Sequence, residues 1–140
     1  MTGEELIQQF EDGTTSADTF HHADHVRLAF EYLCRYPAVE ALGKFCAALQ
    51  RFAAAQGKPQ RYHETITWAY LLLIRERQAR AGCAQTSCVQ TWEEFAERNA
   101  DLLVWKGGVL STLYRQETLD SELARRTFVL PDRPAISPET

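Results

Sequence analysis

The sequence predicts an all-α fold, a single-domain helical bundle of four main helices followed by short C-terminal helices. Apolar residues recur at helical spacing through nearly the whole chain, and no alternating strand pattern persists. A chain of 140 residues suits one domain, and it buries roughly two-thirds of its unfolded surface. We place the bundle in residues 1–130 and expect an irregular, proline-rich tail over residues 131–140.

Turn residues and prolines mark the predicted ends of the three helices in the N-terminal half of the chain. Glycine ends helices, and proline suits the first turn of the next helix because the missing N–H has no helical partner there. The turn-rich stretch 12–16 separates the first two helices. The expected helices span residues 3–11, Thr19 to Tyr36, and Pro37 to about Gly57.

The fourth expected helix, about residues 60–81, is apolar on nearly every side, so it is predicted to be the central element of the bundle. The later helices are shorter. Thr91 and Glu94 form a capping box for a helix that ends near Asn99. Further signals are a turn at Gly107-Gly108 before residues 109–114, and Ser121 as the cap of a last helix that ends near Arg126.

Composition and charge exclude several classes of protein. The net charge of −4 argues against a nucleic-acid-binding protein, which normally has a basic face. The longest apolar stretch, Ile66 to Ile74, is too short to cross a membrane, and we see no secretory signal. We therefore expect a cytoplasmic protein with reduced thiols, and the spacing of Cys83 and Cys88 is a poor zinc signature.

All four histidines lie in two short segments near the starts of the second and fourth helices. On a helical wheel, His22 shares the face of the second helix that must be buried, and His25 lies about 60° to one side of it. His63 lies on the inward face of the fourth helix, whereas His21 is further round and Asp24 faces outward. If the helix starts at Asp24 instead, the directions of His21 and His22 are undetermined.

These histidines predict a transition-metal site of copper, iron or zinc. An up-down-up-down order makes the second and fourth helices parallel and brings His22, His25 and His63 to the same end. Imidazole is the commonest protein ligand for these metals, and three ligands leave a position open for water or substrate. Glu64 is predicted as a fourth ligand, a hydrogen-bond acceptor behind a ligand, or the general base.

Three further residues are candidates for supporting the site. Asp24 is in position to orient a histidine, although the wheel places it outward. Tyr70 and Arg77 share the wheel face of His63, so they are candidates for anchoring an anionic substrate. The competing interpretation is a core tyrosine and an arginine whose stem lies along apolar surface.

The predicted function is that of a small metal-dependent enzyme acting on a small metabolite. Zinc favours hydrolytic or lyase chemistry, and copper or iron favours oxygen-dependent oxidation, which is the version we prefer. One alternative is a metal-free His/Glu acid–base catalyst. Another is a non-enzymatic helical interaction or pH-sensing module with structural histidines, with a homodimer left open.

Two sequence blocks carry a resemblance to a family. The strings from Phe20 to Ala29 and from Tyr62 to Thr67 resemble F-x-H-x-D-H-V-R-L-A and H-E-T-I-T blocks in a family of short, uncharacterised bacterial proteins. The ending from Ala124 to Asp132 is similar to the close of that family. The loop from Cys83 to Cys88 departs from the pattern. The resemblance implies no reaction, and its matching positions are His22, Asp24, His25, His63 and Glu64.

Overall fold

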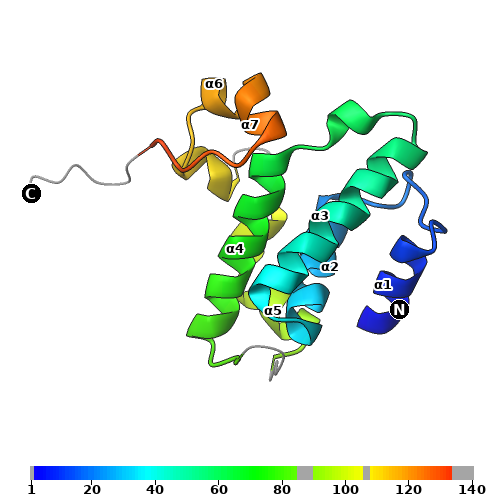
Figure 1. The fold of residues 1–140 in the computed structure, drawn as a ribbon. Coiled ribbons are helices and arrows are strands. Elements are labelled where there is room, and N and C mark those ends of the chain that lie inside the picture. The colour runs from blue at the N-terminus through cyan, green and yellow to red at the C-terminus, as the bar shows by residue number, and fades with distance from the viewer. Residues whose placement is uncertain (1, 85–89, 106–107, 134–140) are drawn as a thin grey trace, which may run out of the picture.

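The computed structural model describes residues 2–84, 90–105 and 108–133, and in these residues the protein is all-helical with no strand. The prediction of an all-α single domain is confirmed (Figure 1). The α-helices are α1 (Gly3–Glu11), α2 (His22–Arg35), α3 (Ala38–Ala55), α4 (Glu64–Arg80), α5 (Trp92–Arg98), α6 (Gln116–Leu119) and α7 (Glu122–Arg126). Short 3₁₀ helices are η1 (Pro59–Arg61), η2 (Ala100–Leu103) and η3 (Val109–Thr112).

Several helix ends differ from the sequence prediction. Helix α2 starts at His22 rather than Thr19, because the Asp24 carboxylate accepts the His21 N–H at 2.9 Å and caps the helix there. Helix α4 starts at Glu64 rather than near residue 60, after the separate 3₁₀ turn η1. Within the segment 109–114, Val109–Thr112 form the 3₁₀ turn η3.

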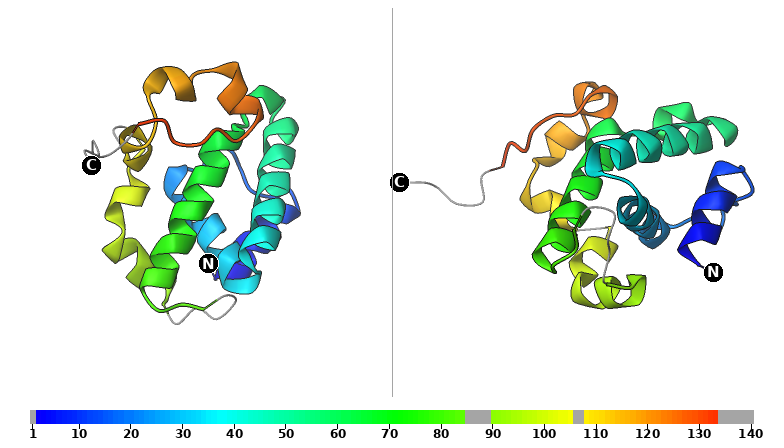
Figure 2. Two further views of the ribbon diagram at one scale, coloured as in Figure 1. Left: turned by 60° about the vertical axis from the view of Figure 1, so that its left-hand side comes forward. Right: turned by 60° about the horizontal axis from the view of Figure 1, so that its bottom comes forward.

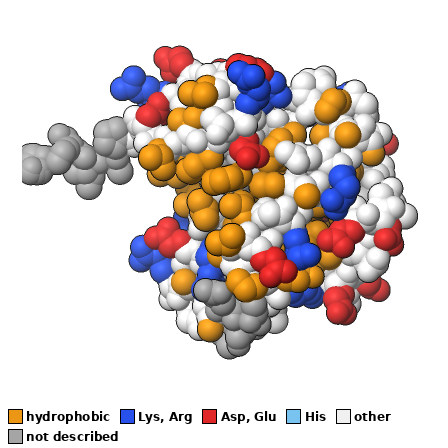
Figure 3. Space-filling view, viewed as in Figure 1, with side chains coloured by type: hydrophobic (Ala, Val, Ile, Leu, Met, Phe, Trp, Pro, Cys, Tyr) orange, Lys and Arg blue, Asp and Glu red, His pale blue; other side chains and the backbone are white. Residues whose placement is uncertain are grey.

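Helix α2, and not α4 as predicted, is the most enclosed element. Its six consecutive residues from Leu28 to Leu33 are all buried, and it contacts α1, α3, α4 and α5. Helix α4 packs against α2, α3 and α7 and keeps an outer face, on which Leu72 is 44% exposed. Figure 3 shows hydrophobic side chains gathered over α4 and over the segment that follows α7.

The C-terminal segment is tied to the start of α4. The buried Thr65 hydroxyl donates to the Thr127 carbonyl at 2.8 Å and accepts the Val129 N–H at 3.0 Å. The ring of Phe128 stacks on Trp68 with a centroid distance of 5.0 Å. These contacts place α6 and α7 beside the N-terminal end of α4 (Figures 1 and 2).

Some predictions fall on residues that the structure does not describe. They are the role of Cys88, the first glycine of the Gly107-Gly108 turn, and most of the expected tail, residues 134–140. Residues 131–133 are described and form no regular element. Within the described residues, no helix combines the length and the apolar character that a membrane span requires.

Candidate functional site

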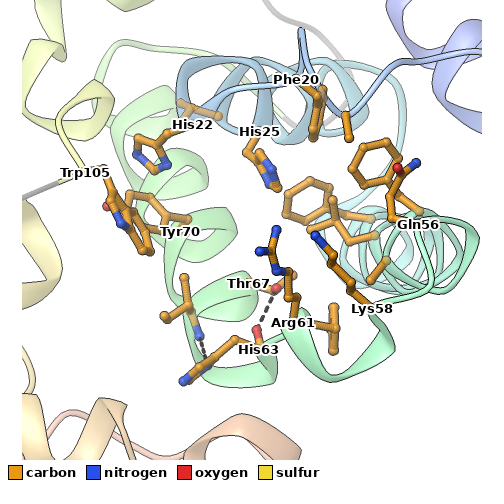
Figure 4. A pocket seen from close by; sticks show the side chains of 18 residues that line it. Phe20, His22, His25, Gln56, Lys58, Arg61, His63, Thr67, Tyr70 and Trp105 are labelled. Carbon is orange, nitrogen blue, oxygen red and sulfur yellow. Dashed lines mark hydrogen bonds between the residues drawn. The ribbon is translucent and has the colours of Figure 1, made fainter.

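Three helix ends surround a cavity of about 680 Å³. The N-terminal ends of α2 and α4 and the C-terminal end of α3 line it, together with η1 and Trp105 (Figure 4). The lining side chains are mainly apolar and aromatic, with Phe20, Phe45, Phe52 and Tyr70 in the wall. Pockets that bind small molecules have volumes of roughly 300–1,000 Å³ and this kind of lining. The cavity therefore has the size and chemistry of a ligand site.

His22 is fixed in the wall of the cavity by a backbone carbonyl. Its Nε2 lies 2.9 Å from the Leu102 oxygen of η2, and because a carbonyl only accepts, Nε2 carries the proton and donates. The ring meets Tyr70 edge-on at 4.9 Å and lies 5.1 Å from Trp105. Burial lowers the pKa of His22, because the surrounding apolar groups disfavour its charged form.

His25 faces the cavity, and none of the described residues forms a hydrogen bond with its ring nitrogens. Its ring lies 4.3 Å from the ring of Phe20. Burial lowers the pKa of His25 to about 4, with a further contribution from His22 and an opposing one from Asp24. The imidazole is therefore neutral at neutral pH, and one of its nitrogens is free to accept a hydrogen bond from a ligand.

His63 turns its ring away from the other two histidines (Figure 4). Its Nδ1 accepts the Ile66 N–H at 3.1 Å and caps α4, while its Nε2 lies 2.7 Å from the Leu119 oxygen. Both ring nitrogens are thus used by the backbone, one as acceptor and one as donor. His63 joins the start of α4 to the end of α6, and its role is structural.

Glu64 does not line the cavity. Its carboxylate accepts the Tyr62 hydroxyl at 2.5 Å, beside the half-buried Cys46. Burial, followed by this hydrogen-bonded cluster, raises the pKa of Tyr62. Burial likewise raises the pKa of the Cys46 thiol. Glu64 therefore faces a neighbouring tyrosine rather than the histidines that it was predicted to assist.

The three supporting candidates have different positions. Tyr70 lines the cavity, and burial raises its pKa to about 12, so its hydroxyl stays protonated. Asp24 is used as the cap of α2. Arg77 lies outside the cavity lining, where it donates to Asn99 at 2.8 Å and pairs with Asp101 at 2.9 Å.

The donor set does not fit the predicted metal site. His22, His25 and His63 do line one cavity, but a metal on His63 would have to break a backbone hydrogen bond at either nitrogen. Over the described ranges, no group of three or more His, Cys, Asp or Glu side chains is placed to hold a metal ion. We therefore derive no chemistry through copper, iron or zinc.

Two cations at the mouth of the cavity were not predicted from the sequence. Lys58 immediately precedes η1 and Arg61 is the last residue of η1. Both are exposed and point into the cavity toward His25 (Figure 4). Helical periodicity does not predict the direction of side chains in such a short turn. The charge pattern does indicate a basic segment, because residues 41–63 contain four basic and no acidic side chains.

Comparison of the chain with protein-family models, curated protein sequences and solved structures found no match. The resemblance to a bacterial family stays a prediction.

Proposed function

We propose that the protein binds a small, largely apolar organic molecule in the cavity at the N-terminal ends of α2 and α4. The observation that carries this proposal is the cavity of about 680 Å³ with an aromatic and aliphatic lining. A few polar groups converge on the apolar wall, which is the usual composition of a small-molecule site. The proposed function includes the small-molecule partner predicted from the sequence and does not include the predicted metal.

The polar groups suit recognition of a ligand more than rapid acid–base catalysis. A general base works best with a pKa near the operating pH, and the pKa of His25 is about 4. A neutral imidazole and a protonated Tyr70 hydroxyl instead offer one acceptor and one donor to a bound molecule. The metal-free catalyst considered from the sequence also relied on Glu64, which lies outside the cavity lining.

A neutral fluorescent probe tests the proposal. We expect N-phenyl-1-naphthylamine to bind the wild-type protein with enhanced, blue-shifted emission, because the probe brightens in apolar surroundings. Ala53 lines the cavity, so Ala53→Phe fills part of it and should weaken binding at least about tenfold, through steric overlap.

Ala54→Phe is the matched control. Ala54 is the next residue of α3, is exposed, and does not line the cavity, so this variant should bind the probe like the wild type. Circular dichroism and thermal unfolding establish that both variants fold. Equal binding by the two variants, or no binding by the wild type, contradicts the proposed function.

A further inference from the structure

The charged groups at the cavity have one sign. Lys58 and Arg61 enter its mouth, and no carboxylate is among the described residues that line it. At neutral pH, burial keeps His22 and His25 in their neutral forms, so the positive charge that faces the cavity belongs to Lys58 and Arg61. This cationic mouth lies in a protein whose net charge is −4.

Arg61 and Lys58 have no carboxylate partner among the described residues, whereas six of the twelve arginines of the chain pair with one. Carboxylates pair with Arg27, Arg35, Arg77, Arg80, Arg125 and Arg126. An unpaired guanidinium and an unpaired ammonium at the rim of an apolar cavity are suited to an oxyanion. Arginine binds carboxylate or phosphate through two parallel hydrogen bonds, and lysine adds a point charge.

We infer that the cavity takes an amphipathic organic anion, with its apolar body among the aromatic side chains and its oxyanion head group on Lys58 and Arg61. This inference is built on the proposed function and names the class of ligand. Apolar burial supplies affinity for the body, and the cations at the mouth select the head group. His25 and Tyr70 lie in the same wall and offer hydrogen bonds to a polar group further along the ligand.

Ligands that share one alkyl chain and differ in head group test the inference. Decanoate, decyl phosphate, decanol and decylamine each displace the neutral probe from the wild-type protein, and their dissociation constants are compared below their micelle-forming concentrations. We expect the better of the two anions to bind at least about tenfold more tightly than decanol, and decylamine to bind most weakly. The order of carboxylate and phosphate then identifies the head group.

The double variant Lys58→Gln/Arg61→Gln should lose this preference for anions, measured within each protein as the ratio of the dissociation constants of decanol and the better anion, so that any general change in cavity affinity cancels. Arg51→Gln is the control for charge, because Arg51 is an exposed cation of α3 outside the cavity lining. The preference of the wild type should also fall as salt is added, since both cations are exposed.

The outcomes separate this inference from the proposed function. Probe binding without a preference for anions, or an anion preference that survives in the double variant, overturns the inference and leaves the apolar site standing. Failure of the wild type to bind the probe or any alkyl ligand overturns both.

Discussion

His25 is expected to make the stability of the folded protein depend on pH well above the range in which carboxylates titrate. Its pKa is about 4 in the folded protein because of burial, against 6.5 for an ordinary histidine. Between these values the unfolded chain binds more protons than the folded one, so acidification favours unfolding. The stabilising contribution is therefore present above the unfolded pKa and is lost as the pH falls through this window.

The magnitude follows from the two pKa values. Since a tenfold difference in proton affinity is worth about 1.4 kcal/mol, the full effect is about 3 kcal/mol. About 2 kcal/mol of it is lost between about pH 7 and pH 5. The lowered pKa of His22 acts in the same direction. The charge of His22 adds to the effect of burial on the pKa of His25, and the charge of Asp24 opposes it. Lys58 and Arg61 are the other charged groups that point toward the His25 ring (Figure 4).

Urea unfolding at closely spaced pH values measures this effect. Between about pH 7 and pH 5, the wild type should lose stability through protonation of His25, and His25→Gln should not. The loss in free energy of unfolding should therefore be smaller by about 2 kcal/mol in the variant. His21→Gln is the matched control, because it removes an exposed imidazole from the residue that precedes α2. Its pH profile should follow the wild type.

Parallel profiles for the wild type and His25→Gln would refute the reasoning. A second measurement needs no variant. The ring protons of His25 in the wild-type protein should titrate by NMR with a midpoint well below 6.5, and an ordinary midpoint for this ring contradicts the buried, neutral state.

Substitutions at four further positions test contacts within the fold. Thr65→Val removes a buried hydroxyl that satisfies two backbone groups of the C-terminal segment, so urea unfolding should show a loss of about 1–3 kcal/mol, which Thr65→Ser avoids. His63→Ala should lower the free energy of unfolding by about 1–2 kcal/mol, because the cap of α4 is lost. Added zinc should raise the melting temperature of neither the wild type nor His63→Ala. In Gly3→Ala, the new Cβ would overlap the carboxylate of Glu31, which is buried and pairs with Arg27 and Arg35, so stability should fall by about 1–3 kcal/mol. Gly43→Ala, in an open helical position, should gain about 1 kcal/mol.

The helices were predictable where a local signal fixes their ends. Helix α1 has the predicted bounds, with Thr2 and Glu5 forming a capping box, and the predicted caps Thr91 and Ser121 are present at α5 and α7. The starts of α2 and α4 were predicted too early. In both cases a side chain several residues later caps the helix, which a search for serine, threonine and proline does not detect.

The candidate site was predictable in position but not in detail. Helical spacing and the order of helices predict that His22, His25 and His63 lie at the same end of the bundle, and all three line one cavity. Periodicity gives the face of a helix and not the partner of a ring nitrogen. The direction of His63 is set by the Leu119 carbonyl, 56 residues away in sequence, and no helical pattern carries that information.

The three histidines illustrate why shared location does not establish a shared ligand. His63 completes both of its hydrogen bonds with the backbone, and His22 completes one, so these two rings hold the fold around the cavity. Of these three, His25 alone leaves both ring nitrogens without a protein partner in the described part of the chain. The His25 ring lines the cavity, so a bound molecule can supply the hydrogen-bond partner that its nitrogens lack. Lys58 and Arg61 at the mouth likewise have no carboxylate partner among the described residues. A ligand that contacts His25, Lys58 and Arg61 would therefore supply hydrogen-bond and charge partners to all three side chains.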